Sequence, residues 1–426
     1  MEVVAFENSL EYARMLDQSD ALSRFKEMFY TPMKNGDPAV YFCGNSLGLQ
    51  PKRAQSFFEK EFEKWQQMAV EGHFDETDPW VMYHHKGKEE LAEILGAKPE
   101  EVVAMNNLTT NIHLMLASFY QPKGLRKKII IEEGAFPSDH YAVASFMEKL
   151  DISPGENLIE IPLPEDGYIS NERIVTKIEE TGEALALVFL PGIQYYTGQF
   201  FDLKAITAAA HKVGSYAGYD LAHAAGNVPV NLHDNEVDFA VWCSYKYMNS
   251  GPGNVAGAYV HEKHTLSKDL PKLKGWWGHN EETRFQMDNV WDPMPGVDSW
   301  MLSNVNIMAN AIHLASLSLF KEAGFKNLRE KSIRLTGYLE YLIQSDDLLA
   351  KEIKIFTPAN PSERGCQLSL YLRNQGKNVF SQLNDKGYIM DWREPNVIRV
   401  APTPLYNSFT EVYHFVDDLK FIISSL

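Results

Sequence analysis

Basic residues are scarce in this sequence of 426 residues, and they are scattered. Forty Lys and Arg residues stand against 57 Asp and Glu residues, which leaves a formal charge of −17. The longest basic run is Arg126-Lys-Lys128. A protein that neutralises the phosphates of DNA or RNA needs a clustered basic surface. The composition therefore predicts that nucleic acid is not a partner.

Long apolar runs are also absent. No stretch reaches the roughly 18 to 20 consecutive apolar residues of a membrane-spanning helix. The N-terminal stretch MEVVAFENSLEYARMLDQSD is acidic and lacks the apolar core of a signal peptide. We therefore expect a cytoplasmic protein that does not enter a membrane.

Cysteine is rare, and Cys43, Cys243 and Cys366 lie far apart. Three cysteines without a CxxC pair make neither a disulfide framework nor a zinc site, so each is expected to be a small buried hydrophobic residue. There is no HExxH motif, and the neighbours His84 and His85 are expected to point in different directions on a helix. The sequence thus predicts no metal site.

Short apolar runs alternate with amphipathic segments through the middle of the chain. Strands are predicted at 101–105, 128–131, 157–161, 184–190, 215–219, 238–243 and 254–260, and helices at 109–120, 138–150, 171–182 and 202–213. Strands that are apolar throughout are typical of a mainly parallel sheet covered by helices on both faces. The predicted fold class is therefore α/β.

The remaining segments predict a second, smaller α+β domain. Residues 306–426 contain a long helical region to about 345, two strands (366–372 and 397–400), a helix near 376–386 and a terminal helix. Helices are also expected at 54–69 and 84–95. We predict an N-terminal segment (1–70) that packs with the small domain, a large domain (71–305) and the small domain (306–426). The aperiodic segment 275–300 is long enough to be functional.

Polar residues follow several of the predicted strands. Lys246 comes after the strand at 238–243, Asp220 and His223 after 215–219, Thr109 after 101–105, and Phe136 after 128–131. Ligands of such sheets bind beyond the carboxyl ends of the strands. Pyridoxal phosphate needs residues of these types: a lysine for its aldehyde, a carboxylate for its pyridine nitrogen, a helix N-terminus for its phosphate and an aromatic face. The constellation predicts this cofactor.

Taken singly, each residue has a simpler explanation. Lys246 could be a surface lysine at a strand end, Asp220 a turn cap and Thr109 a helix N-cap. Phe136 could be a core residue and His223 a buried, hydrogen-bonded histidine. Their common position at predicted strand ends favours the joint interpretation.

The chain resembles kynureninase, a pyridoxal-phosphate enzyme of the aspartate-aminotransferase fold, class V branch, along nearly its whole length. Nine motifs in order carry the resemblance: YFCGNSLGLQPK (41–52), NLTTNIHLMLASFY (107–120), AFPSDHYA (135–142), LPGIQYYTGQFFD (190–202), DLAHAAGNVPVNLHD (220–234), WCSYKYMNSGPG (242–253), GWWGH (275–279), PGVDSWMLSN (295–304) and RVAPTPLYNS (399–408).

The resemblance implies a role for each matching residue. Lys246 carries the cofactor, Asp220 binds its ring nitrogen, and Arg399 binds the substrate carboxylate. Tyr245 is implied as a proton donor near the phosphate. The other implied cofactor-binding residues are Leu108, Thr109, Phe136, Pro137, Ser138, Asp139 and His223, with Trp276 and Asn304 contributed by the second subunit of a homodimer. Some family members have a hydroxyl residue where this sequence has Pro191, so no contact is assigned there.

The implied reaction is the hydrolytic cleavage of kynurenine or 3-hydroxykynurenine to anthranilate or 3-hydroxyanthranilate, with alanine as the second product. Residues matching His73, Ser303 and Asn304 accompany a preference for the 3-hydroxylated substrate in the family, which favours that substrate here.

Three other functions remain open. A class V aminotransferase shares the aspartate and the lysine. A cysteine desulfurase needs a cysteine on a mobile loop, whereas Cys366 is in a strand-like segment. A non-catalytic dimeric scaffold would not need Lys246, Asp220 and Arg399.

Overall fold

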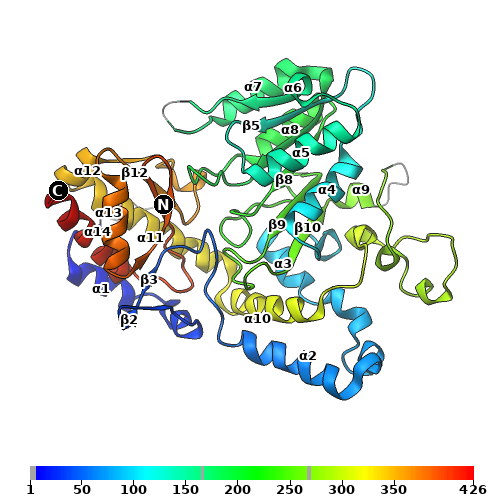
Figure 1. Cartoon of the computed structure of the whole chain (residues 1–426), viewed down its shortest axis with the longest axis horizontal. Coiled ribbons are helices and arrows are strands. Elements are labelled where there is room, and N and C mark those ends of the chain that lie inside the picture. The colour runs from blue at the N-terminus through cyan, green and yellow to red at the C-terminus, as the bar shows by residue number, and fades with distance from the viewer. Residues whose placement is uncertain (1–5, 165–166, 266–269) are drawn as a thin grey trace.

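The structure is a computed structural model that describes residues 6–164, 167–265 and 270–426. The first five residues of the predicted N-terminal segment lie outside it. Within the described residues, a seven-stranded sheet occupies the middle of the molecule and a four-stranded sheet lies to one side of it (Figure 1).

The seven-stranded sheet is parallel except for one strand. Its order is β4 (Val102–Ala104), β10 (Ala256–Val260), β9 (Phe239–Cys243), β8 (Tyr216–Asp220), β7 (Leu185–Pro191), β5 (Lys128–Glu132) and β6 (Leu158–Ile161). Only β10 runs antiparallel to its neighbours. The reason is that residues 244–255 form turns instead of a crossover helix, so the chain returns beside β9 in the opposite direction. The predicted mainly parallel sheet is confirmed.

Both faces of this sheet are buried, because successive side chains of each strand point to opposite sides. On β7, Leu187 and Phe189 join one apolar core, while Val188 and Leu190 join the other. The first core includes residues of α4 (Leu108–Phe119) and α5 (Pro137–Lys149), and the second includes residues of α7 (Asn171–Thr181) and α8 (Leu203–Lys212). The α/β class is thus confirmed, with helices on both faces.

The four-stranded sheet belongs to the C-terminal part of the chain. Its order is β11 (Ile353–Ile355), β12 (Leu368–Leu372), β15 (Val397–Val400) and β14 (Asp391–Arg393), all antiparallel. The helices of this part are α11 (Phe325–Gln344), α12 (Asp347–Glu352), α13 (Gly376–Asp385) and α14 (Phe409–Ser424). Residues of α11, α13 and α14 share one apolar core with the sheet.

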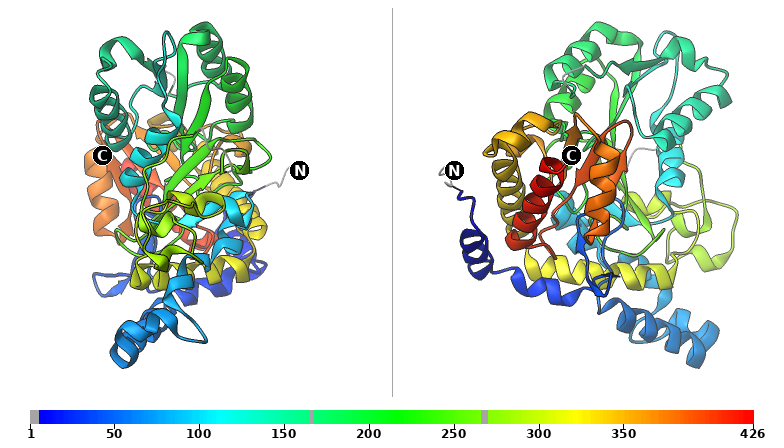
Figure 2. Two further views of the ribbon diagram at one scale, coloured as in Figure 1. Left: turned by 90° about the vertical axis from the view of Figure 1, so that its right-hand side faces the viewer. Right: turned by 60° about the vertical axis from the view of Figure 1, so that its left-hand side comes forward.

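The N-terminal segment contacts this C-terminal part (Figure 2). Helix α1 (Leu10–Gln18) lies against α14, where Asp17 accepts hydrogen bonds from the backbone N–H groups of Phe409 and Thr410. Strand β3 (Val40–Tyr41) pairs with β13 (Tyr388–Ile389). Helix α2 (Ala54–Met68) instead lies along α10 (Ile307–Ala323) at the lower edge of Figure 1. The domain boundaries themselves stay a prediction.

Three local expectations differ from the structure. The helix expected to begin at residue 84 begins at Lys88 (α3, Lys88–Leu95), because Gly87, with φ +77°, separates it from a 3-10 turn at Trp80–His85. The long region after 305 is two helices, α10 and α11, that meet at Gly324. Cys43 is only partly buried, whereas Cys243 and Cys366 are buried as expected.

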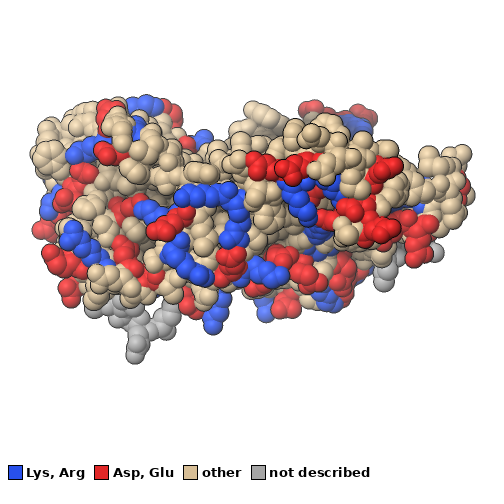
Figure 3. Space-filling model, turned by 90° about the horizontal axis from the view of Figure 1, so that it is seen from below, with Lys and Arg blue, Asp and Glu red and all other residues tan. Residues whose placement is uncertain are grey.

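Charged side chains of both signs are interspersed on the face that Figure 3 shows. A search of the described residues finds no helix with the length and apolar character that a membrane span requires.

Candidate active site

A cavity of about 330 Å³ lies where the carboxyl ends of the large sheet meet the strands β14 and β15 of the small sheet. It brings together residues that are far apart in the sequence. Ten of the predicted site residues line it: Leu108, Thr109, Phe136, Ser138, Asp139, Asp220, His223, Tyr245, Lys246 and Arg399.

Lys246 lies in the turn that follows β9, and its side chain is half-buried. Its ammonium nitrogen is 5.9 Å from the centre of the Phe136 ring. The backbone around it is held in place, since Gly48 N–H donates to the Tyr245 carbonyl (2.8 Å) and Asn249 N–H donates to the Lys246 carbonyl (3.0 Å). The amine therefore faces the cavity from a fixed turn, not from a free surface loop.

Two buried carboxyl groups, Asp220 and Asp139, share a hydrogen bond on the cavity wall. Asp220 ends β8 and accepts a hydrogen bond from Ala222 N–H (2.7 Å). Burial raises the pKa of both groups, and the neighbouring Asp220 charge raises that of Asp139 further. The charge of Lys246 and the hydrogen bond from Asp139 lower the pKa of Asp220 and so partly offset its burial. Asp139 therefore holds the shared proton and Asp220 the negative charge.

A third carboxyl group on this wall, Glu132, was not predicted from the sequence. It is the last residue of β5 and is 2 % exposed. Burial raises its pKa to about 8, and the charges of Asp220 and Glu160 act in the same direction. Glu132 is thus mainly uncharged at neutral pH.

Two helix N-termini meet at another side of the cavity. Asn107 caps α4 by accepting from Thr110 N–H (3.0 Å), and Pro137 begins α5. The hydroxyl oxygens of Thr109 and Ser138 lie 2.7 Å apart. Backbone N–H groups of the first helical turn have no partner inside the helix, and the helix dipole is positive there. This arrangement suits a phosphate group.

Arg399 reaches the cavity from the small sheet. It is 1 % exposed, donates to the Tyr195 carbonyl (Nη1 to O, 2.6 Å) and is paired with Asp391 through Nη2. Its Nε is buried and has no hydrogen-bond partner among the described residues. Burial lowers its pKa to about 10, so the guanidinium remains charged at neutral pH. A charged fork with a free donor is suited to a carboxylate ligand.

The ionisation states of two further cavity residues follow from burial. Burial, with the charges of Lys246, Arg399 and Arg393, holds the pKa of His223 well below its usual range, so the imidazole is neutral. Burial and the adjacent Cys243 raise the pKa of Tyr245, so the phenol keeps its proton and can donate it in a hydrogen bond.

Five predicted residues do not line this cavity. Pro137 only begins α5. His73 donates from Nδ1 to the Val70 carbonyl (3.1 Å) and lies edge-on to Trp80. The indole N–H of Trp276 donates to the Arg284 carbonyl (3.0 Å), and the residue is 47 % exposed. Ser303 and Asn304 are exposed. A single chain therefore leaves His73, Trp276, Ser303 and Asn304 on its surface.

Several lining residues were missed. Tyr195 lies inside a motif that the sequence analysis used, and its position after a predicted strand was the available signal. Arg393, on β14, also lines the cavity; Asp391, on the same strand, does not line it but pairs with Arg399 on β15. Asn45 and Ser46 come from the N-terminal segment; they lie inside the motif at 41–52, but no role was assigned to them.

The cavity fits pyridoxal phosphate on its own evidence. The Asp139 Oδ1 atom is buried and has no hydrogen-bond partner within the described part of the chain. Asp139 lines the same cavity as Lys246 and the two helix N-termini that suit a phosphate group. Such an atom needs a ligand or water to complete its hydrogen bonds.

Two solved structures of cysteine desulfurases have the same fold. A cysteine desulfurase from Thermococcus onnurineus superposes with a TM-score of 0.73 at 17 % identity, covering 91 % of this chain and 95 % of its own. A cysteine desulfurase from Escherichia coli gives a TM-score of 0.73 at 16 % identity, covering 95 % and 99 %. The fold is that of the pyridoxal-phosphate-dependent enzymes of the class V aminotransferase group.

Curated relatives define the family more narrowly. Kynureninase from Flavobacterium johnsoniae is 48 % identical over 98 % of this chain and 99 % of its own length, and kynureninase from Myxococcus xanthus is 49 % identical over 97 % of each. A family model of the kynureninase C-terminal domain matches residues 328–419. The chain belongs to the kynureninase family. Kynureninases depend on pyridoxal phosphate, which confirms the cofactor prediction.

Proposed function

We propose that this chain is the enzyme kynureninase, which hydrolyses a carbon–carbon bond of kynurenine or 3-hydroxykynurenine to give anthranilate or 3-hydroxyanthranilate and alanine. One observation carries the proposal: Lys246 and Asp220 of the large sheet and Arg399 of the small sheet line a single cavity of about 330 Å³. The cavity thus presents Lys246 and Asp220 to the cofactor and Arg399 to the carboxylate of an amino-acid substrate.

When bound, pyridoxal phosphate supplies an electron sink for the carbanion that cleavage leaves behind. Asp220 contributes the carboxylate that keeps the ring nitrogen protonated. Thr109, Ser138 and the N–H groups of Leu108 and Thr109 hold the phosphate. Phe136 and His223 line the cavity and would lie against the cofactor ring, His223 in its neutral form.

The substrate is positioned by Arg399, which binds the α-carboxylate while Asp391 and the Tyr195 carbonyl hold its orientation. Lys246, once its nitrogen is free, accepts and returns the proton at the α-carbon. Tyr245 keeps its phenolic proton at neutral pH and gives it to the β-carbon, which keeps the electron pair when the Cβ–Cγ bond breaks. Water adds to the γ-carbonyl carbon of the substrate and supplies one oxygen of the carboxylate product.

We further propose that 3-hydroxykynurenine is favoured over kynurenine. The support is the family resemblance at His73, Ser303 and Asn304. In a single chain these residues are exposed or partly exposed, so this preference requires them to face a cavity completed by another subunit.

A homodimer with shared active sites is therefore part of the proposal, with Trp276 and Asn304 completing the partner's site. Exposed apolar side chains support it: Trp276 contacts Phe285 (ring centres 5.4 Å apart), Phe285 contacts Phe74 (5.6 Å), and Trp65 on α2 is 57 % exposed. Clustered exposed aromatic groups mark interaction surfaces. A cytoplasmic location is proposed on the three free thiols.

The test is an absorbance spectrum of the purified enzyme before and after addition of 3-hydroxykynurenine, with product fluorescence followed for both substrates. We expect a cofactor band that responds to substrate, and 3-hydroxyanthranilate formed faster than anthranilate. The matched variants are Lys246→Ala, which should lose turnover, and Arg399→Lys, which should mainly raise KM.

Other results would each redirect the assignment. A cofactor band without cleavage of either compound would overturn the proposal in favour of a class V aminotransferase. Desulfurase activity is disfavoured by the burial of Cys243 and Cys366. Faster formation of anthranilate would overturn only the substrate preference.

A further inference from the structure

A second guanidinium group, that of Arg393, lines the cavity, and the proposed function gives it no role. Arg393 lies on β14, and Arg399 lies on the neighbouring strand β15. In the antiparallel register of these strands Asp391 is opposite Arg399, and Arg393 follows two residues later on β14. Residues two apart on a strand point to the same face of the sheet, and so do directly opposed residues. All three charged side chains therefore project from one face of the small sheet.

Both guanidinium groups lie near one aromatic ring. The Cζ atom of Arg393 is 5.7 Å from the centre of the Tyr195 ring, and that of Arg399 is 6.0 Å from it. The Tyr195 ring lies edge-on to Phe136 (ring centres 5.4 Å apart), and the Lys246 nitrogen is 5.9 Å from the Phe136 ring centre. A series of ring contacts thus connects the lysine of the cavity to both arginines.

Arg399 has few free donors for a substrate. Its Nη1 atom donates to the Tyr195 carbonyl (2.6 Å), and its Nη2 atom is paired with Asp391. Of its three nitrogens, Nε alone has no partner in the described part of the chain. A carboxylate has two oxygens with about four lone-pair sites. A second donor group is therefore needed to complete the hydrogen bonds of a bound carboxylate.

Arg393 has such donors. Within the described residues its side chain makes one hydrogen bond, from Nε to the Asp391 Oδ2 atom (3.0 Å), so its two terminal nitrogens are available. The Arg393 side chain is 36 % exposed, whereas that of Arg399 is 1 % exposed. Arg393 is thus the more accessible of the two arginines to an entering substrate, and its planar fork of donors matches a carboxylate.

The three charges on this face leave one positive charge in excess. Arg393 and Arg399 carry two positive charges, and the Asp391 carboxylate between them carries one negative charge. Besides burial and Lys246, both arginines help to lower the pKa of His223, so their charges reach the cavity. One excess positive charge matches one carboxylate of a ligand.

The buried pair of Lys88 and Asp298 provides a contrast. Lys88 contacts both oxygens of Asp298 (2.7 and 2.6 Å), so the two charges neutralise each other. Side-chain atoms of His84 and His85 lie within 4.8 Å of this carboxylate. The sequence predicts that the two imidazoles point apart, but they close a 3-10 turn and their ring centres lie 4.0 Å apart. The charges of Lys88 and Asp298 balance, whereas those around Arg393 do not.

We propose that Arg393 binds the substrate together with Arg399, so that the α-carboxylate is held by two guanidinium groups. This inference rests on the proposed function, because it concerns the same substrate in the same cavity. The Asp391 Oδ2 atom accepts hydrogen bonds from both arginines, so the two groups are close enough for one carboxylate to contact both. Arg393 thereby makes the enzyme selective for amino acids with a free carboxylate.

The test compares two ligands of the holoenzyme, L-alanine and L-alaninamide, which differ in the carboxylate charge. Each is titrated and followed by the cofactor absorbance. Arg393→Gln should weaken alanine binding by about 10-fold, since hydrogen bonds to charged groups are strong, and should change alaninamide binding by less than about 2-fold. Arg393→Lys, which keeps the charge without the fork, should give an intermediate affinity for alanine. Arg373→Gln, at an exposed position after β12, is the control and should bind both ligands like the wild type.

A double variant separates direct binding from an effect through Asp391. If Arg393 only held Asp391 in place, Arg393→Gln would add nothing to Asp391→Asn. We expect the double variant to bind alanine at least about 3-fold more weakly than Asp391→Asn alone. The cofactor absorbance of each variant serves as the check that it is folded.

Three results would overturn the inference: unchanged alanine binding by Arg393→Gln, an equal loss of alanine and alaninamide binding, or no added effect in the double variant. Cleavage of kynurenine by the wild-type enzyme is measured separately. Its absence would count against the proposed function, whereas the alanine titrations would still decide the role of Arg393.

Discussion

The hydroxyl oxygens of Thr109 and Ser138 lie 2.7 Å apart at the N-termini of two helices that follow different strands. If both bind the cofactor phosphate, Thr109→Val should weaken pyridoxal phosphate binding by about 10- to 100-fold, since a hydrogen bond to a charged group contributes about 1.5–3 kcal/mol. Titration of the cofactor-free enzyme, followed by absorbance, measures this. Thr110→Val is the control, because the Thr110 hydroxyl binds Asn107 instead. Equal affinities for the two variants would contradict the assignment.

Asp391 is expected to orient Arg399 for the substrate. It pairs with both Arg399 and Arg393, so Asp391→Asn leaves two guanidinium groups side by side with less neutralising charge. We expect KM to rise by about 10-fold with a smaller change in kcat, because the loss falls on substrate positioning. Steady-state kinetics provide the measurement, with Asp417→Asn on the exposed face of α14 as the control. A lower KM would show that Asp391 competes with the substrate carboxylate.

Glu132 should make the stability of the cofactor-free enzyme depend on pH. Its pKa is about 8 in the folded protein against an ordinary value of 4.5, so between these values the folded state holds a proton that the unfolded state has lost. Stability attributable to this group therefore falls as pH rises from about 5 to 8. Glu132→Gln should remove this dependence. The unfolding midpoint of the variant should therefore rise relative to that of the wild type as pH increases from about 5 to 8.

The control for Glu132 is Glu148→Gln, an exposed position on α5. The midpoints are measured at pH 5 to 8 by thermal scans. A constant difference between Glu132→Gln and the wild type at all of these pH values would show that Glu132 is not protonated in the folded enzyme.

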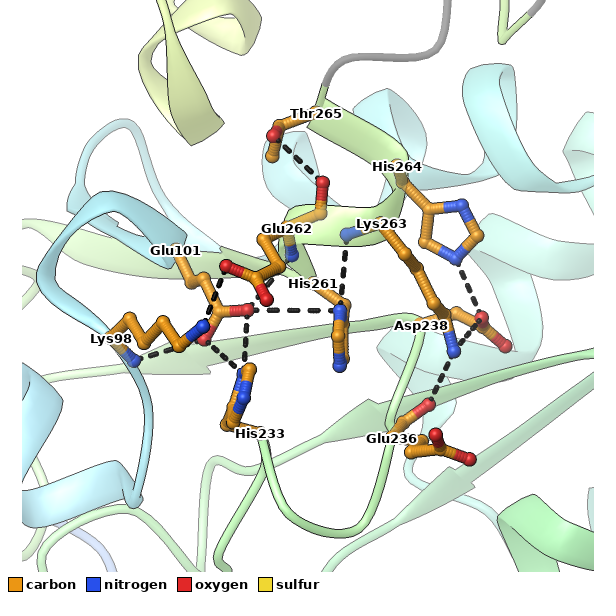
Figure 4. Close-up of polar contacts among 10 residues, drawn as sticks. All are labelled: Lys98, Glu101, His233, Glu236, Asp238, His261, Glu262, Lys263, His264 and Thr265. Atoms are coloured by element: carbon orange, nitrogen blue, oxygen red, sulfur yellow. Dashed lines mark hydrogen bonds and ion pairs between the residues drawn. The ribbon is translucent and has the colours of Figure 1, made fainter.

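Asp238 should have the opposite effect on stability: the enzyme should lose stability as pH falls, not as it rises. Burial alone would raise its pKa, but hydrogen bonds from His211 (2.8 Å) and His264 (2.7 Å) outweigh this effect and lower it. The resulting stability is present above the ordinary aspartate pKa and is lost as pH falls through the lower folded value. Figure 4 shows Asp238 with His264 and Lys263.

Asp238→Asn should therefore destabilise the enzyme at neutral pH by about 3–5 kcal/mol, as removal of one partner from a buried charged network does. The difference from the wild type should shrink in acid. Denaturant unfolding at pH 7 and at about pH 2.5, between the unfolded and folded pKa values, measures it, with the exposed Asp234→Asn as the control. A difference that grows in acid would refute the account.

Several of the predicted residues that line the cavity lie at or just beyond the end of a strand. Asp220 and Lys246 come within three residues of a strand end, so the apolar runs alone located them, and the parallel sheet then gathered them at one edge. Glu132 also ends a strand, but the sequence analysis did not single it out, because its burial depends on residues such as Asp139 and Asp220 that come from other elements.

The amino-acid sequence by itself determined the alternation of strands and helices, the family and the residues at the strand ends, because these depend on short-range patterns and local motifs. Only the tertiary structure decided that Arg399, held by Asp391, reaches the cavity from a second sheet and that His84 and His85 lie beside Glu281 and Asp298. Those contacts join segments up to about 200 residues apart, and their geometry is set by packing and by one 3-10 turn, which no local pattern specifies.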